Sequence, residues 1–280
     1  MFVPGDQAGK IEKARYAGSD CVILDLEDGV AESKKESARS NLRQSLQQTW
    51  PESPAVLVRI NSDPSTLRAD ISAAVHPRVL GIMLPKCSVA KDILTVAQEL
   101  TEAEQRIGLA PGTVKLFLLI ESARGLLELP ALALASERVA ALVFGAEDWC
   151  LDMGIVRTRA GTELEIARWN VAVCARAHGL SAIDTVYADF KDTEGLLQDT
   201  QNCRRIGFSG KLAIHPKQIE PIHSVFAPTQ AEIVEAERIV AAFNQAEAQQ
   251  SGAIAVNGRM VDKPIAERAR KLLERAEKNG

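Results

Sequence analysis

The chain has 280 residues, of which 46% are hydrophobic and 25% are charged, and its formal net charge is −4. This apolar fraction is typical of a globular protein and excludes a wholly disordered chain. The mildly acidic balance argues against a nucleic-acid-binding protein, which usually carries a basic stripe.

Nothing in the sequence predicts a membrane segment or a secretory signal. No apolar run approaches the roughly 18 residues that a membrane helix needs, and no basic region followed by an apolar stretch begins the chain. The five cysteines are odd in number and form no Cys-x-x-Cys pair, which indicates buried, reduced thiols. We therefore expect a cytoplasmic protein with neither a disulfide framework nor a zinc site.

Short apolar runs alternate with longer amphipathic segments through residues 1–228. The expected strands cover residues 2–3, Cys21–Asp25, 56–60, 81–84, Lys115–Ile120, 140–144, 183–187 and 211–214. Helix-like stretches between them include residues 33–47, 89–106, 162–178 and Thr193–Ile206. The runs are almost continuously hydrophobic, as parallel strands buried on both faces are. Eight such units predict an α/β protein with a (β/α)8 TIM barrel. A doubly wound sheet is the alternative, but no Gly-x-Gly-x-x-Gly turn follows any run.

Residues 229–280 follow a different pattern. A helix is expected over residues 231–248, and Asn257-Gly258 between two short runs predicts a type I′ hairpin. Pro264 begins a last amphipathic helix. This segment is too small for a core of its own, so we expect a C-terminal extension that packs on the barrel or on a neighbouring subunit.

Charged and polar side chains follow the expected strands at the end where the chemistry of such barrels gathers. They are Asp25, Glu27, Asp28, Arg59, Asn61, Lys86, Glu121, Glu147, Asp148 and His215. Several carboxylates in one concavity repel one another unless a cation compensates. Oxygen ligands without thiolates favour Mg²⁺.

Glu121 and Asp148 are the candidate Mg²⁺ ligands, because each comes at the end of a hydrophobic strand. The alternative is that they only complement the dipoles of the following helices. Among Asp25, Glu27 and Asp28, one carboxylate is a candidate for holding metal-bound water, and another for pairing with Lys86 or Arg59.

An ordered set of motifs resembles one known family. The motifs are Phe2-Val3-Pro4-Gly5, Leu24-Asp25-Leu26-Glu27-Asp28-Gly29-Val30, Arg59-Ile60-Asn61, Leu84-Pro85-Lys86, Ile120-Glu121-Ser122-Ala123, Phe144-Gly145-Ala146-Glu147-Asp148, Ala213-Ile214-His215-Pro216 and Gly258-Arg259-Met260-Val261-Asp262-Lys263-Pro264. Together they resemble the citrate lyase β-subunit-like branch of the HpcH/HpaI aldolase superfamily, which includes malyl-CoA and citramalyl-CoA lyases. Relatives usually carry several residues before the first strand, which leaves open a truncated strand or a start upstream of Met1.

The resemblance implies a (β/α)8 barrel that binds Mg²⁺ through Glu121 and Asp148. It also implies that Arg59 contacts the substrate and that Asp262 reaches the active site of a neighbouring subunit, in a homotrimer or a hexamer of trimers. The expected reaction is cleavage of a 3-hydroxyacyl-CoA thioester, such as citramalyl-CoA or malyl-CoA, into acetyl-CoA and a 2-oxo acid. A citrate lyase β-subunit acting on citryl-ACP, a malyl-CoA thioesterase and a non-catalytic binding protein are the alternatives.

The expected roles follow from side-chain chemistry. Arg59 is permanently charged and has several N–H donors, so it can stabilise a developing oxyanion. Asp262 is a candidate for exchanging a proton with the enolate carbon. The alternative for Asp262 is a helix cap before Pro264.

Further residues are candidates for contacts with the substrate. Glu27, Asp28, Lys86 and Glu121 are the candidate substrate-binding residues besides Arg59. The alternative for Lys86 is an ion pair with one of the carboxylates at the strand ends. Lys10, Lys13 and Arg15 are candidates for the coenzyme A phosphates, with a solvated helix face as the alternative.

Overall fold

The computed structural model describes residues 1–249 and 251–279. The chain divides into two compact units, Met1–Ile222 and His223–Gly280. The division falls inside helix α10 (Ile219–Phe226), whereas the sequence places the domain boundary between residues 228 and 229, and that boundary stays a prediction. In the described part of the chain, no helix is long and apolar enough to cross a membrane.

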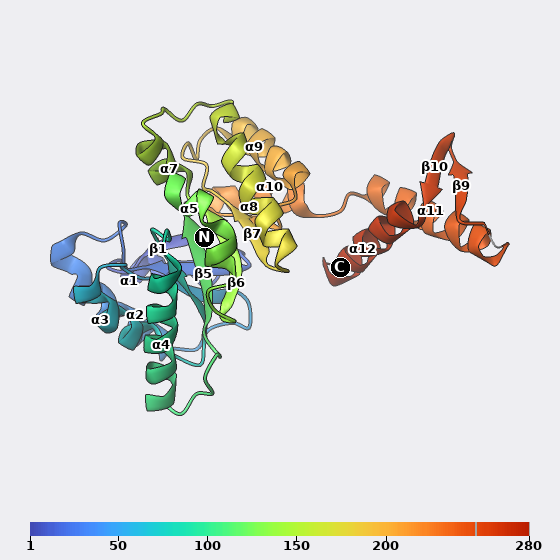
Figure 1. Ribbon diagram of the computed structural model, residues 1–280. Coiled ribbons are helices and arrows are strands. Elements are labelled where there is room, and N and C mark those ends of the chain that lie inside the picture. The colour runs from blue at the N-terminus through green and yellow to red at the C-terminus, as the bar shows by residue number, and fades with distance from the viewer. Residues whose placement is uncertain (250, 280) are drawn as a thin grey trace. The chain divides into compact units, whose positions relative to one another are not determined.

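The first unit is built on one curled sheet, in which the described residues form eight parallel strands in chain order (Figure 1). They are β1 (Phe2–Pro4), β2 (Cys21–Asp25), β3 (Ala55–Arg59), β4 (Val79–Leu84), β5 (Lys115–Ile120), β6 (Val139–Phe144), β7 (Ser181–Asp184) and β8 (Gly210–Lys211). Each strand pairs in parallel with the next. The α/β class is therefore confirmed, and the sheet is compatible with a TIM-like barrel.

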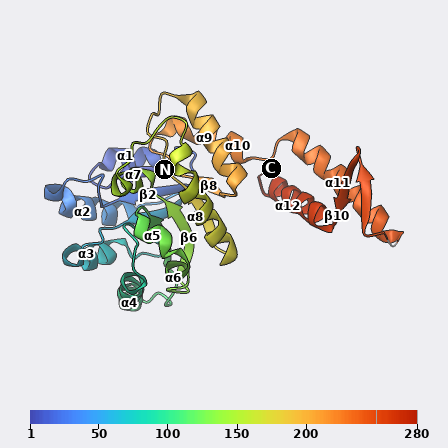
Figure 2. The same ribbon diagram turned by 45° about the horizontal axis from the view of Figure 1, so that its top comes forward.

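Helices follow the strands and lie around the outside of the sheet (Figure 2). They are α1 (Ala8–Ala14), α2 (Lys35–Leu46), α3 (Pro64–Ala74), α4 (Ala90–Arg106), α5 (Ala123–Leu127), α6 (Leu129–Ala133), α7 (Ala146–Met153), α8 (Glu165–Ala177), α9 (Thr193–Ile206) and α10, with short 3-10 helices at Glu32–Lys34, Thr162–Leu164 and Pro216–Gln218. On the opposite face of the sheet, apolar side chains from β2 to β6 pack together with Leu212. Residues on separate strands meet in this way because the sheet curls.

The ends of β7 and β8 differ most from the sequence prediction. β7 and β8 stop at Asp184 and Lys211, although runs to residues 187 and 214 were expected. Beyond β8, the Ile214 N–H donates to Gln218 Oε1 at 2.8 Å instead of to a neighbouring strand. The Phe2 N–H donates to the Ala213 carbonyl at 2.8 Å, which links β1 to the segment after β8.

The second unit contains the helix, hairpin and helix expected from the sequence. Helix α11 (Gln230–Ala248) is followed by the antiparallel pair β9 (Ala253–Val256) and β10 (Arg259–Asp262), and then by α12 (Lys263–Asn279). Asn257 and Gly258 have φ angles of 52° and 75°, as a type I′ turn requires. Phe243, Val256, Val261 and Ala266 form a small apolar cluster in this unit.

Candidate active site

A cavity of about 680 Å³ lies at the carboxyl ends of the strands in the first unit. Charged residues from several strand ends line it together with apolar side chains. The lining residues include Phe2, Pro4, Lys10, Lys13, Asp25, Gly29, Arg59, Leu119, Glu121, Gly145, Asp148, Thr185, Val186, Leu212 and His215. Parallel strands bring their carboxyl ends to one edge of a sheet, so residues far apart in sequence meet here.

Arg59, the last residue of β3, is held by two carboxylates. Its Nε and one terminal nitrogen donate to the two oxygens of Asp25, both at 2.7 Å, and its other terminal nitrogen lies 3.1 Å from Glu27 Oε2. Burial alone would lower the pKa of Arg59, but the hydrogen bonds and charge of Asp25 and the charge of Glu27 raise it above its ordinary value. A guanidinium has five N–H donors, so at least two remain for a ligand.

Lys86 connects two carboxylates from different strand ends. Its ammonium group donates to Glu27 Oε1 at 2.7 Å, and its backbone N–H donates to Glu121 Oε1 at 2.6 Å. The residue adopts a φ of 57°, which is uncommon outside glycine. This conformation lets one residue donate to Glu27 through its side chain and to Glu121 through its backbone.

Glu121 follows β5 and is a buried carboxylate. Burial raises its pKa to about 8, and the charges of Asp148 and Glu27 act in the same direction. The Lys86 backbone hydrogen bond and the charge of Arg59 lower the pKa but do not offset the burial. Among the described residues, Glu121 forms no ion pair, so a bound cation would stabilise its charged form.

Asp148 lies in the first turn of α7, and its negative charge contributes to the raised pKa of Glu121. No hydrogen bond or ion pair involves the Asp148 carboxylate within residues 1–249 and 251–279. Gly145, just before α7, has no side chain that would clash with the Glu121 carboxylate. A Cβ atom at this position would lie 2.7 Å from Glu121 Oε2. The glycine therefore allows α7 to begin directly against the buried carboxylate.

The charges of this site suit a divalent cation. Asp25 and Glu27 form ion pairs with Arg59 and Lys86, whereas Glu121 and Asp148 form no ion pair among the described residues. Mg²⁺ is commonly bound by one or two carboxylates, with waters and substrate oxygens as its other ligands. The described residues include no group of three or more His, Cys, Asp or Glu arranged to hold a metal. Glu121 and Asp148 thus fit a site in which the substrate supplies further ligands.

Comparison with known proteins decides the family. A family model for HpcH/HpaI aldolase/citrate lyase matches residues 1–216. The chain belongs to this family. The resemblance that the sequence motifs carried is confirmed.

Named relatives of this HpcH/HpaI family member are mostly lyases. The citrate lyase subunit beta of Haemophilus influenzae is 36% identical over 99% of this chain and 95% of its own length. The mitochondrial citramalyl-CoA lyase of Rattus norvegicus is 34% identical, over 98% of this chain and 84% of the relative. The (3S)-malyl-CoA thioesterase of Cereibacter sphaeroides is also 34% identical, over 99% of this chain and 93% of the relative. The expectation of a carbon–carbon lyase is confirmed at the level of the family.

A solved structure of similar sequence shares the fold. The protein CitE from Mycobacterium tuberculosis, in complex with magnesium, acetoacetate and coenzyme A, has a TM-score of 0.81 and 30% identity. The match covers 99% of this chain and 96% of that one.

The structure of this family member brings most of the predicted site residues together. Arg59, Glu121, Asp148, Lys10 and Lys13 all line the cavity. The predicted substrate-binding residues Glu27, Asp28 and Lys86 are not among the lining residues. Glu27 is occupied by Arg59 and Lys86, and Asp28 is an exposed residue 3.7 Å from the Lys86 ammonium.

Two further predicted residues have other contacts. The expectation that Arg15 contacts phosphate is wrong, because its side chain is buried behind α1, over the ring of Trp50 and against the end of α2. Asp262 belongs to the second unit, where its carboxylate accepts the Ile265 N–H at 3.2 Å and so caps α12.

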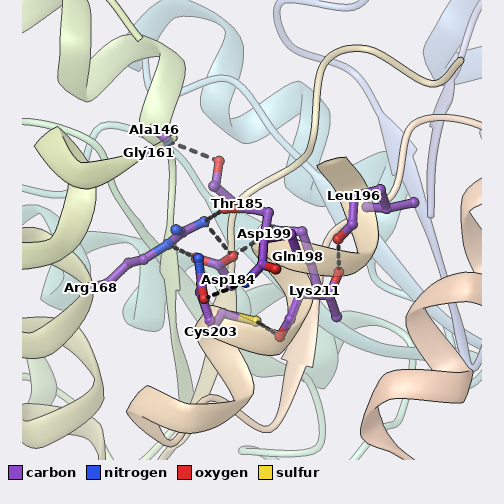
Figure 3. Close-up of polar contacts among 12 residues, drawn as sticks. Ala146, Gly161, Arg168, Asp184, Thr185, Leu196, Gln198, Asp199, Cys203 and Lys211 are labelled. Carbon is purple, nitrogen blue, oxygen red and sulfur yellow. Dashed lines mark hydrogen bonds and ion pairs between the residues drawn. The ribbon is translucent and has the colours of Figure 1, made fainter. Parts of the chain in front are cut away.

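Sequence reasoning missed a buried charged cluster next to the site (Figure 3). Arg168 of α8 donates twice to Asp184 at 2.9 Å, and Lys211 contacts both Asp184 and Asp199. It also missed Thr185, which follows Asp184 and accepts the Ala146 N–H at 3.0 Å. Arg168 and Asp199 lie in amphipathic helices, where charged residues are usually exposed. Asp184 and Lys211 lie in strands expected to be buried, which was a signal that sequence reasoning could have used.

Proposed function

We propose that this chain is a Mg²⁺-dependent lyase that cleaves a 3-hydroxyacyl-CoA thioester of the citramalyl-CoA or malyl-CoA type into acetyl-CoA and a 2-oxo acid. The observation that carries the proposal is the pair Glu121 and Asp148, a buried carboxylate and an unpaired one, in the same cavity as Arg59, Lys10 and Lys13. We also propose that the curled sheet closes into a complete (β/α)8 barrel, which the Phe2–Ala213 hydrogen bond supports.

Glu121 and Asp148 would hold Mg²⁺, which supplies a Lewis acid for the substrate's carboxylate and hydroxyl oxygens when it is bound. The hydroxyl proton would pass to solvent water, and the bond between the hydroxyl-bearing carbon and the α-carbon of the thioester would then break. The hydroxyl oxygen becomes the ketone of the 2-oxo acid, and the bonding electrons pass to the thioester as an enolate. Arg59 would stabilise the developing oxyanion with its free N–H donors, because Asp25 and Glu27 already hold the guanidinium in place.

The enolate needs a proton to become acetyl-CoA. We assign this step to Asp262 of a neighbouring subunit, in a homotrimer or hexamer, as acid in cleavage and as base in condensation. Lys10 and Lys13 would contact the phosphates of coenzyme A, since both line the cavity and carry charge opposite to phosphate.

Two related reactions fit the same residues. A citrate lyase β-subunit would cleave citryl bound to a carrier protein, and a thioesterase would release free thiol without a 2-oxo acid. The similarity to the citrate lyase β-subunit and to the (3S)-malyl-CoA thioesterase keeps both in consideration.

The deciding experiment is an assay of 2-oxo acid and free thiol from (S)-citramalyl-CoA and malyl-CoA, with Mg²⁺ and with chelator. We expect pyruvate or glyoxylate only in the presence of metal. Free thiol without 2-oxo acid would mean a thioesterase. No product from either thioester, with turnover of citryl-ACP, would mean a carrier-bound substrate.

Variants test the metal assignment. Glu121→Gln and Asp148→Asn should each lose Mg²⁺ binding, measured by calorimetry, and lose activity at least 100-fold, while circular dichroism stays unchanged. Glu137→Gln, an exposed glutamate before β6, is the matched control and should behave as wild type. Wild-type metal affinity in Glu121→Gln would contradict the assignment.

Mixing two inactive variants tests the assignment of Asp262. Asp262→Asn should slow turnover by about 10²–10⁴-fold and leave KM little changed, as the loss of a general acid does. When Asp262→Asn and Glu121→Gln are unfolded and refolded together, mixed oligomers should regain activity. Mixtures that stay inactive would contradict action across subunits.

A further inference from the structure

Helix α7 carries Asp148 but lacks a side-chain cap of its own. Its N-cap residue is Gly145, which has no side chain to accept the free N–H groups of the first turn. Helices usually satisfy these groups with Ser, Thr, Asp or Asn at the N-cap. A side chain at residue 145 is excluded here, because its Cβ would lie 2.7 Å from Glu121 Oε2. The buried carboxylate therefore denies α7 an ordinary cap.

Thr185 supplies an acceptor from another part of the chain. Its Oγ1 accepts the N–H of Ala146, the first residue of α7, at 3.0 Å (Figure 3). Thr185 is buried, with 2% of its surface exposed. An unpaired N–H at this buried position would be costly, so the hydrogen bond fixes where the helix starts. Asp148 lies two residues further along the first turn.

The residue before Thr185 is firmly anchored. Asp184 receives two hydrogen bonds from Arg168 and one from Lys211, and its backbone carbonyl accepts the Leu212 N–H at 2.9 Å. Figure 3 shows Asp184 between these two cations, with Thr185 turned toward Ala146. Farther along α7, Asp152 Oδ2 accepts the Ala123 N–H at 2.7 Å, two residues after Glu121. Helix α7 is thus held between the segment that follows β7 and the segment that bears Glu121.

We propose that Thr185, in the segment that follows β7, is a positioning residue that caps α7 and thereby sets Asp148 at the distance from Glu121 that a divalent cation needs. The inference rests on the proposed function, because it assumes that both carboxylates bind metal. Groups that orient metal ligands typically change metal affinity 10–100-fold when they are removed.

The test compares Thr185→Val, which keeps the shape and removes the acceptor, with Thr185→Ser, which keeps the acceptor. Binding of Mn²⁺ is measured on the full-length protein from the electron paramagnetic resonance signal of the free ion. Amide hydrogen exchange is followed in the peptide that contains Ala146. Thr200→Val is the matched control, because the buried Thr200 hydroxyl donates within α9, to Leu196, and does not contact α7.

We expect Thr185→Val to weaken Mn²⁺ binding about tenfold and to speed exchange at the start of α7. Thr185→Ser and Thr200→Val should stay within about twofold of wild type. Equal losses in the Val and Ser variants would overturn the inference, because the acceptor would then not matter. A raised KM for thioester with unchanged Mn²⁺ affinity would also overturn it, by making Thr185 a substrate contact.

Failure of the proposed function gives a different result. Wild-type protein that binds no Mn²⁺ would overturn the proposed function, and the inference with it. Loss of binding in Glu121→Gln together with wild-type affinity in Thr185→Val would overturn the inference alone.

Discussion

Glu121 is a carboxylate whose surroundings disfavour its charge. It is 4% exposed, and the neighbouring carboxylates Asp148 and Glu27 add to the effect of burial on its pKa. The same surroundings that destabilise the ion would strengthen its attraction to a bound cation, because the local dielectric constant is low. A residue that costs stability in the free protein is therefore well suited to bind metal.

This cost predicts a pH-dependent difference in stability between wild type and Glu121→Gln. In chelator, the folded-state pKa of Glu121 is about 8, against an ordinary value of 4.5, so the folded protein keeps a proton that the unfolded chain releases. The stability of wild type should therefore fall relative to Glu121→Gln as pH rises from about 4.5 to about 8. By pH 8.5 the relative loss should reach at least about 1.4 kcal/mol, the equivalent of one pKa unit.

Urea unfolding at pH 5 and pH 8.5 measures this difference. Glu137→Gln, on the exposed surface, should show no such trend. Parallel stability curves for wild type and Glu121→Gln would contradict the raised pKa. Saturating Mg²⁺ should remove the wild-type deficit at pH 8.5, because binding stabilises the folded state.

Helix α7 has to satisfy two structural requirements. It must bring Asp148 close to Glu121, and it must begin without clashing with that carboxylate. Gly145 meets the second requirement, and Thr185 and Asp152 hold the helix in place for the first.

Gly145→Ala should therefore weaken metal binding through a steric effect on Glu121. The φ and ψ angles of Gly145 are −109° and 91°, a region open to alanine, so the backbone itself is not strained. Calorimetry should show at least about tenfold weaker Mg²⁺ binding. The control is Gly154→Ala, at the other end of α7.

Gly154 has a φ of 66° and open space around its Cα. This change should therefore cost about 1 kcal/mol of stability and leave the affinity for Mg²⁺ unchanged. Equal metal affinities in the two variants would contradict the steric argument.

Across the first unit, buried charges join elements that are distant in sequence. Arg168, Asp184, Asp199 and Lys211 come from α8, β7, α9 and β8, and two cations face two carboxylates. The Lys211 side chain is completely buried. Removing one member of such a group leaves an uncompensated charge in the interior, which typically costs 3–5 kcal/mol.

We predict that Lys211→Met lowers the free energy of unfolding by about 3 kcal/mol, as measured by urea denaturation at pH 7. The double variant Lys211→Met with Asp199→Leu removes one charge of each sign and should recover at least half of this loss. The reason is that Arg168 and Asp184 remain as a matched pair. A double variant less stable than Lys211→Met would show that the cluster contributes by packing rather than by charge balance.

The sequence alone determined the class of fold and predicted most of the charged residues that line the cavity. Continuous apolar runs predicted parallel strands, and Glu121 and Asp148 stood out because they follow such runs. Asn257-Gly258 determined the hairpin, since its turn depends on local backbone conformation. These features are local, and a local pattern is visible in sequence.

Tertiary structure decided which groups contact one another. It turned Arg15 away from the cavity, set Lys86 between Glu27 and Glu121, and placed Thr185 against the start of α7. Each of these contacts depends on the direction of a side chain and on a partner 30 or more residues away. Sequence spacing does not encode such pairings, because they arise only when the curled sheet brings its strand ends together.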